Sequence, residues 1–107
     1  MPVVKPTMRE KHRYILYKVE AAQPLFEEQV KRASYAAVLS FLGEYGASLA
    51  SPKFISYDPK TQLAILRCNH TETQKVKAAL ALCASIEGKK AAFRLQKVSG
   101  TIAGLNR

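Results

Sequence analysis

The sequence is poor in the residues from which most enzyme and metal sites are built. Its 107 residues include two histidines, two cysteines and no tryptophan. Neither His12 nor His70 has a second histidine or a cysteine at a ligand spacing, so we expect no zinc site. Cys68 and Cys83 have no sequence-local base that would activate a thiolate, and we expect them to be reduced thiols in the core.

Loops and carboxylate pairs that hold phosphates or magnesium are also missing. The chain contains neither a Walker loop nor a G-x-G-x-x-G sequence. Its acidic residues form no evident pair on strands that would hold catalytic magnesium. We therefore expect the chain to have no catalytic residues and to bind no metal or other cofactor itself.

Long apolar runs are absent as well. No stretch reaches the roughly 18 apolar residues of a membrane-spanning helix, and the first six residues have no apolar core of signal-peptide length. We therefore expect a cytoplasmic protein without a membrane segment. The length suits a single domain over residues 1–107, with residues 1–10 as a flexible basic arm.

Acidic residues are few, and this imbalance is informative. Lysine and arginine number 17 against eight aspartates and glutamates, which gives a formal net charge of +9. Such an excess favours a polyanionic partner, with nucleic acid first and an acidic membrane surface second. A basic protein without any such partner is the remaining alternative.

Periodicity and turn residues predict the order strand, helix, strand, strand, helix, strand. We expect strands at 14–19, 54–57, 63–68 and 92–98, with a turn at 58–61 joining the middle pair. This order is the βαββαβ pattern of the α+β class with a ferredoxin-like or RRM-like fold. It has a four-stranded antiparallel sheet with two helices on one face.

The first helix is expected from Pro24 to about Tyr45, with Gly46 at its end. Its apolar stripe is wider than a one-sided surface helix needs. Two explanations remain open: a deep groove in its own core, or a protein contact through Tyr35, Leu39 and Leu42. The stripe consists of Phe26, Val30, Ala33, Ala37, Phe41 and Tyr45, widened by Val38, Leu39 and Leu42.

The second helix is expected to begin with a capping box formed by Thr71 and Gln74, and to end at Gly88. Its spacing predicts one buried stripe. This stripe comprises Val76, Ala79, Leu80, Cys83 and Ile86.

The first strand is apolar on both faces, because Ile15 and Tyr17 alternate with Tyr14 and Leu16. Such a strand is typical of a sheet that is covered on both sides. We expect the helices to cover one side, and the C-terminal segment or a partner to cover the other. The strand at 63–68 lacks the aromatic residues of an RNA-recognition motif, so we expect backbone and shape recognition of RNA instead of base stacking.

A small anion-holding corner is one interpretation of residues 97–101. Gly100 permits a tight turn, while Ser99 and Thr101 can cap the N–H groups that follow. With Lys97 nearby, these groups suit a phosphate or carboxylate. A plain turn with a cap is the alternative.

Three stretches together resemble a known family, the archaeal ribonuclease P protein component 2 family, which is related to the eukaryotic POP-five subunit. They are residues 6–15, the hairpin over 57–68, and Val98-Ser99-Gly100-Thr101-Ile102. The resemblance implies an RRM-like domain within a ribonucleoprotein endonuclease that removes the 5′ leader from precursor tRNA. It implies that the RNA subunit performs the Mg²⁺-dependent hydrolysis, and that this chain supports that RNA.

The resemblance also implies partners and contact residues. The partners are ribonuclease P RNA and ribonuclease P protein component 3, a TIM-barrel-like subunit, in a heterotetramer, with precursor tRNA contacted indirectly and no membrane involved. By position, the implied RNA contacts are Lys11, His12, Arg13, Arg67, Ser99, Gly100 and Thr101. Charge and expected exposure add Lys89, Lys90, Arg94 and Lys97.

Other classes remain open at this point. A ribosomal protein or ribonucleoprotein assembly factor with a ferredoxin-like fold would share the charge. An acylphosphatase-like hydrolase would need an early glycine-rich loop, and residues 19–26 contain no glycine. A small-ligand regulatory domain that dimerises through its sheet would not need so large a positive charge.

Overall fold

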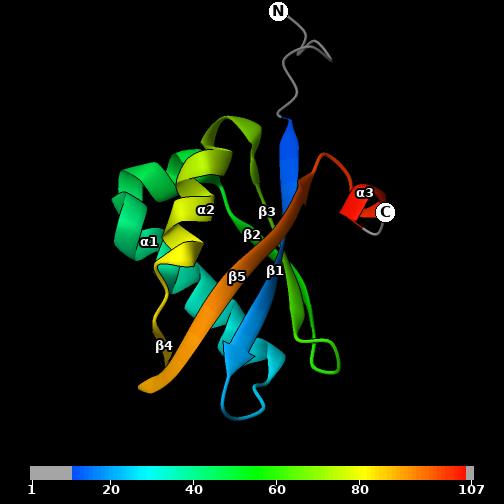
Figure 1. The fold of residues 1–107 in the computed structure, drawn as a ribbon. Helices are drawn as coiled ribbons and strands as arrows, with labels where there is room; N and C mark the ends of the chain where they lie inside the picture. Colours follow the sequence, from blue (N-terminus) through cyan, green and yellow to red (C-terminus); the bar gives the residue numbers. More distant parts are fainter. Residues whose placement is uncertain (1–10, 106–107) are drawn as a thin grey trace, which may run out of the picture.

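The computed structural model describes residues 11–105, which form an antiparallel sheet with two helices packed against one face (Figure 1). This confirms the α+β class, while the basic arm expected at residues 1–10 lies outside the described residues. The elements, in chain order, are β1 (His12–Ala21), α1 (Glu27–Ala50), β2 (Lys53–Asp58), β3 (Leu63–Asn69), the 3₁₀ helix η2 (His70–Glu72), α2 (Thr73–Ala81), β4 (Ser85–Ile86), β5 (Lys89–Ser99) and α3 (Ile102–Leu105).

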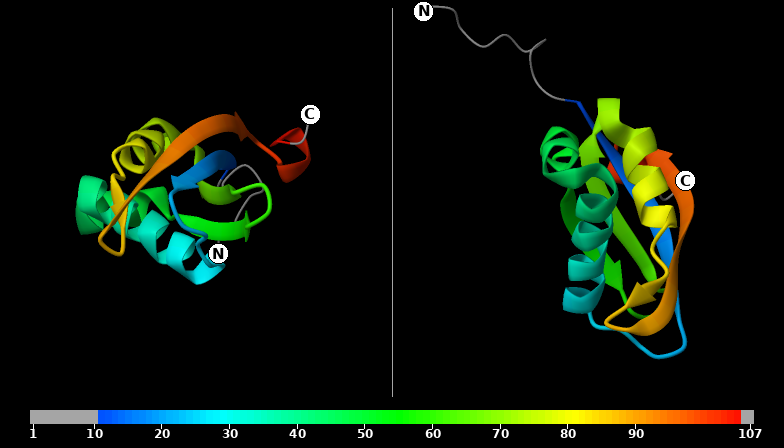
Figure 2. Two further views of the ribbon diagram at one scale, coloured as in Figure 1. Left: turned by 60° about the horizontal axis from the view of Figure 1, so that its bottom comes forward. Right: turned by 90° about the vertical axis from the view of Figure 1, so that its left-hand side faces the viewer.

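The sheet has five strands in the order β2-β3-β1-β5-β4, so the prediction of four strands was wrong. The extra strand arises where Ser85 and Ile86 pair with the first two residues of β5. The turn between them contains Glu87 and Gly88, whose φ angles are 51° and 81°. Two consecutive residues with positive φ form the tight turn that a hairpin requires. Figure 2 shows how β5 curves along the sheet beside β1.

The second helix is shorter than the sequence predicts. It ends at Ala81, so Ile86 lies on β4 and Gly88 lies in the hairpin turn. The predicted capping box at Thr71 was also wrong. Asn69 caps the preceding 3₁₀ helix instead, since its Oδ1 accepts a hydrogen bond from the Thr71 N–H at 3.2 Å.

The first helix is longer than predicted and is kinked at Gly43. Gly43 has φ 75° and ψ 176°, a backbone conformation that only glycine adopts readily. The buried line of the helix follows residues four apart, at Val30, Ser34 and Val38. Three residues of the predicted apolar stripe do not belong to this buried line and are exposed. The exposed fraction is 50% for Phe41, 79% for Tyr45 and 78% for Phe26, which is the N-cap residue.

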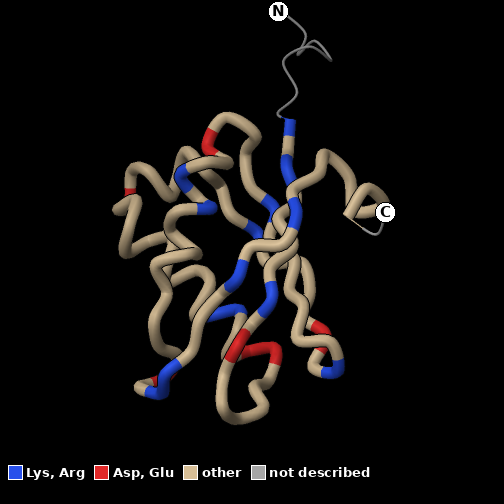
Figure 3. The backbone as a smooth tube through the Cα atoms, in the orientation of Figure 1, with Lys and Arg blue, Asp and Glu red and all other residues tan. Residues whose placement is uncertain are grey.

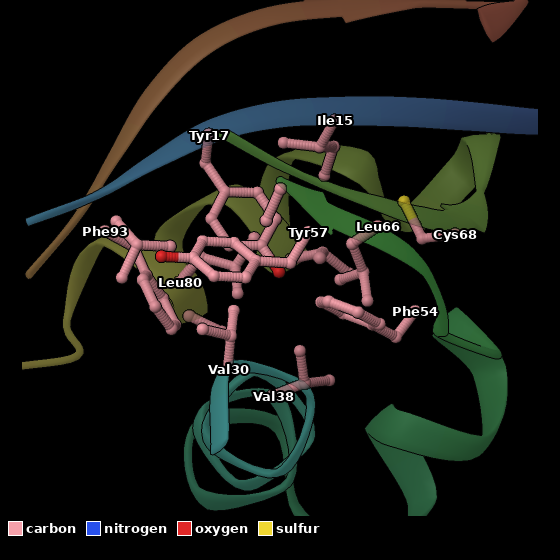
Figure 4. Close-up of a cluster of buried hydrophobic side chains, with 14 of the residues drawn as sticks. Ile15, Tyr17, Val30, Val38, Phe54, Tyr57, Leu66, Cys68, Leu80 and Phe93 are labelled. Atoms are coloured by element: carbon pink, nitrogen blue, oxygen red, sulfur yellow. The ribbon is translucent and has the colours of Figure 1, made fainter. Parts of the chain in front are cut away.

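The core lies between the sheet and these two helices. Val30 and Val38 project from α1 towards Tyr17 and Leu66 on the sheet (Figure 4). The rings of Tyr17 and Phe93 meet edge to face, with their centroids 5.0 Å apart. Tyr17 is fully buried, and its hydroxyl lies 2.5 Å from Ser34 Oγ. The helices α1 and α2 thus cover one face of the sheet and leave the opposite face uncovered by them.

Candidate nucleic-acid interface

Side chains of β1 alternate between the two faces of the sheet. Ile15, Tyr17 and Val19 are buried under the helices, whereas Tyr14 and Leu16 are only half-buried and lie on the other side. This confirms that β1 is apolar on both faces. We call the side opposite the helices the second face. The strand register places the following residues there: Lys53, Ser56 and Asp58 of β2, Leu63, Ile65, Arg67 and Asn69 of β3, His12, Tyr14, Leu16, Lys18 and Glu20 of β1, and Ala92, Arg94, Lys97 and Ser99 of β5.

The register fixes which of these side chains are neighbours, because residues directly opposite one another share a face. Tyr14 lies between Arg67 and Ser99, and Arg67 in turn lies opposite Lys53. Leu16, on the next row, lies between Ile65 and Lys97. The second face therefore has an apolar centre with cations on both sides.

Positive charge dominates this face. Figure 3 shows basic positions along β1 and β5, with acidic positions near one end of these strands. Lys18 and Lys53 are exposed, whereas Arg94 forms a hydrogen-bonded ion pair with Glu20. The hydrogen bond with Glu20 raises the pKa of Arg94. Arg67 is half-buried, and its Nε has no hydrogen-bond acceptor among residues 11–105.

The turn at residues 99–101 is held by its own side chains. Ser99 Oγ accepts a hydrogen bond from the Thr101 N–H at 3.3 Å, and Thr101 Oγ1 accepts one from the Gly104 N–H at 3.0 Å. Two of the donors in the predicted anion-holding corner are therefore already used as caps. Gly104 sits so close to Ser99 Oγ that an added Cβ would collide with it.

The short helix α3 covers one end of the second face. It packs against β1 and β5, and its Leu105 is buried outside the main core cluster of the described residues. Of the two coverings expected for this face, the C-terminal segment or a partner, the C-terminal segment is observed at this end, over β1 and β5. Leu16 and Ile65, nearer the middle of the sheet, stay partly exposed.

Residues from both ends of the chain meet beside β1. His12 lies opposite Asn69, and Arg13 points towards the other face, opposite Cys68. Arg13 Nη1 donates to the His12 carbonyl at 3.1 Å and lies 3.7 Å from the position that a Cβ on Gly100 would take. The Lys11 carbonyl accepts a hydrogen bond from the His70 N–H at 2.9 Å.

The remaining predicted RNA contacts lie elsewhere. Lys89 and Lys90 begin β5, about 30 Å from Ser99 along the strand at roughly 3.3 Å per residue. Lys89 Nζ donates a hydrogen bond to Gln23 Oε1 at 2.6 Å. The eleven residues predicted from the sequence therefore form two groups rather than a single patch, with Arg94 between them on β5.

Lys18 and Lys53 are on the second face and were missed by the sequence reasoning. The signal for Lys18 was its even-numbered position on the strand that carries Tyr14 and Leu16. Lys53 gave no such signal, because it follows Pro52 at the beginning of β2 and its face depends on the pairing with Arg67.

The residues predicted to contact another protein have different environments. Tyr35 is tied to the core, since its hydroxyl accepts a hydrogen bond from the Phe54 N–H at 2.7 Å, and Leu42 packs against the core cluster. Leu39 is 49% exposed. Further exposed apolar side chains are those of Phe41, Tyr45 and Leu49 on α1, and of Leu82 at the C-cap of α2.

This apolar surface borders a groove of about 500 Å³ between α1, α2 and β4. The residues that line the groove include Ala33, Ala37, Phe41 and Leu82. Residues 33–52 contain no lysine or arginine, although the chain has 17 such residues. The part of α1 within residues 33–52 thus differs from the second face in charge, although α1 carries Lys31 and Arg32 nearer its start.

The described part of the chain offers no metal site. Residues 11–105 contain no group of three His, Cys, Asp or Glu side chains placed to hold a metal ion. Cys68 and Cys83 are both free, and burial raises the pKa of both thiols. No helix within 11–105 is long and apolar enough to span a membrane.

Comparisons with known proteins agree with one another. The family model for the Rpp14/Pop5 family matches residues 13–107. Ribonuclease P protein component 2 of Thermococcus gammatolerans is 43% identical over 102 residues, which cover 95% of this chain and 85% of that protein. The protein of the same name from Pyrococcus abyssi is 37% identical over all 107 residues and 91% of its own length.

A solved structure has the same fold. A chain in the cryo-EM structure of yeast ribonuclease MRP superposes with a TM-score of 0.69, over 87% of this chain and 76% of that chain. Its sequence is only 14% identical, so this likeness concerns the fold alone.

Proposed function

The chain belongs to the Rpp14/Pop5 family, and we propose that it is a protein subunit of ribonuclease P. In this role it binds and supports the catalytic RNA that removes the 5′ leader from precursor tRNA. The observation that carries the proposal is similarity over nearly the whole chain to relatives named ribonuclease P protein component 2.

The charge distribution supports an RNA-binding role. Cations that contact phosphates release the counterions condensed on the RNA, and this release drives binding. The described residues offer such cations on the second face and at the ends of β1 and β5. The RNA subunit would perform the hydrolysis and hold the required Mg²⁺, with this chain neutralising nearby phosphates.

The proposed protein partner is ribonuclease P protein component 3, in a cytoplasmic complex containing two copies of each protein. The exposed apolar side chains near Leu39 favour a protein contact on the helix side. This surface has no lysine or arginine of its own between residues 33 and 52, so it does not suit a phosphate backbone.

Affinity recovery tests the proposal. The tagged chain is purified from its own cells in moderate salt, and the RNA and proteins that accompany it are sequenced. We expect ribonuclease P RNA and component 3 to be enriched over a tag-only control. Recovery of ribosomal RNA with assembly factors would instead support the alternative ferredoxin-like RNA-binding protein.

A further inference from the structure

The second face carries an apolar patch that the helices leave uncovered. Leu16 and Ile65 lie opposite one another on β1 and β3, and Tyr14 lies two residues along the same strand. All three side chains are partly exposed. Because α3 packs against β1 and β5, the Ile65 side of the patch, on β3, lies farther from α3.

Cations lie on two sides of this patch. Lys53 and Arg67 are directly opposite one another beside Tyr14, and Lys18 is two residues beyond Leu16. At about 3.3 Å per residue, the rows of Tyr14 and Lys18 are roughly 13 Å apart. Lys18 and Lys53 form no ion pair with residues 11–105, and the buried Nε of Arg67 has no acceptor there.

The Nε of Arg67 is a buried donor that an anion from outside the domain would satisfy, and the two exposed lysines add positive charge beside it. The apolar centre between them suits contact with a flat, weakly polar group. A nucleic acid strand supplies both, since phosphates alternate with base rings along it. In an RNA duplex the base faces are stacked inside, whereas an unpaired strand can lay them on a protein surface.

We propose that the second face binds an unpaired segment of RNA, with bases against Tyr14, Leu16 and Ile65 and phosphates at Lys18, Lys53 and Arg67. The inference rests on the function proposed above and adds the type of RNA and the surface. It also differs from the expectation, drawn from the sequence, that base stacking plays no part.

The absence of tryptophan from the chain permits a direct test. Tyr14→Trp places a single fluorophore on the second face, and Phe26→Trp places one at an exposed site at the start of α1. The probes are a 12-nucleotide oligouridylate and a 12-base-pair RNA duplex, each titrated to millimolar nucleotide. We expect the oligouridylate to quench the indole of the Tyr14→Trp variant and to leave that of the Phe26→Trp variant unchanged. The duplex should quench the Tyr14→Trp variant less.

Two further comparisons test the contribution of the Tyr14 ring and the contribution of the lysine charges. Tyr14→Phe keeps the ring and should keep oligouridylate affinity, whereas Tyr14→Leu should weaken it by about 5- to 100-fold. Replacing Lys18 and Lys53 by Gln should lower the slope of log affinity against log salt by about 1.4. The matched double variant Lys31→Gln with Lys77→Gln removes the same charge from α1 and α2 and should leave the slope unchanged.

The inference is overturned if the Tyr14→Trp variant is not quenched, if the duplex quenches it equally, or if both lysine pairs change the slope alike. Recovery of ribonuclease P RNA by the wild-type chain is unaffected by those outcomes, so the proposed function would stand. Loss of that recovery with quenching intact would leave an unpaired-RNA site in a protein of another function.

Discussion

Tyr17 on β1 and Ser34 on α1 share a hydrogen bond of 2.5 Å between two fully buried hydroxyl groups. Ser34 Oγ donates to the Val30 carbonyl at 2.8 Å, so the Tyr17 hydroxyl is the donor in the shared bond. We expect Ser34→Ala to destabilise the fold by about 1–3 kcal/mol, because it leaves a buried donor unpaired. Tyr17→Phe should cost less. Urea denaturation measures both, and equal or reversed costs would contradict this assignment.

Burial also gives Tyr17 a pH dependence. Desolvation raises the pKa of the Tyr17 phenol well above its usual range, despite the hydrogen bond with Ser34. The unfolded chain then loses this proton at lower pH than the folded chain. The contribution to stability is therefore complete below about pH 10 and falls as the pH rises above it.

Denaturation at pH 8 to 11 tests this expectation. Tyr17→Phe should show a shallower loss of stability above pH 10 than the wild type. The exposed Tyr45→Phe serves as the matched control and should follow the wild type. A wild-type slope in the Tyr17→Phe variant would mean that other groups account for the alkaline loss.

Adding a side chain at Gly43 is expected to lower the free energy of unfolding because of the backbone conformation alone. An added Cβ would meet no heavy atom within 4 Å, yet the φ of 75° and ψ of 176° are unfavourable for any L-residue. We expect Gly43→Ala to cost about 1–3 kcal/mol in unfolding free energy. Calorimetry measures the loss. A neutral result would show that α1 can become straight at this position.

The exposed apolar surface of α1 is expected to bind a protein and not RNA. Leu39→Asp should reduce recovery of component 3 at least tenfold while the RNA recovered directly with the chain is retained. Phe26→Asp introduces the same charge at the exposed N-cap residue of the helix and should affect neither. Loss of RNA with component 3 retained would contradict the assignment of the two sides.

The group formed by Lys11 and Arg13 is expected to contact phosphates. Replacing both by Ala should lower the log–log salt slope of RNA binding by about 1.4–1.8. Arg13 also donates to the His12 carbonyl, so the circular dichroism melt of the variant must match the wild type. An unchanged slope in a folded variant would remove these residues from the RNA contacts.

Element order and core were predictable where local patterns agreed with the final packing. Ile15, Tyr17 and Leu66 are buried as the alternation of their strands indicates, and Asp58 opens the β2–β3 turn by accepting a hydrogen bond from the Lys60 N–H at 2.9 Å. Ile86 fits a helical stripe equally well, because one residue at a spacing of three cannot distinguish a helix from a short strand beyond it.

The second face was only partly predictable for a related reason. Its composition depends on the register between strands distant in sequence, which places Lys53 beside Arg67 and Lys97 beside Leu16. The irregularity between Leu16 and Tyr17 in the β1–β5 pairing also changes which β5 residues share this face. Charge counts alone treat Lys89 and Lys97 alike, although the strand separates them widely.

The uneven placement of charge has a consequence for the approach to a partner. With basic residues along the sheet strands and none between residues 33 and 52, the field of a polyanion exerts a torque on the domain before any contact forms. The torque turns the sheet towards the RNA and the middle of α1 away from it. Encounters then begin in a productive orientation, and the middle of α1 stays accessible to a protein partner while the RNA is bound.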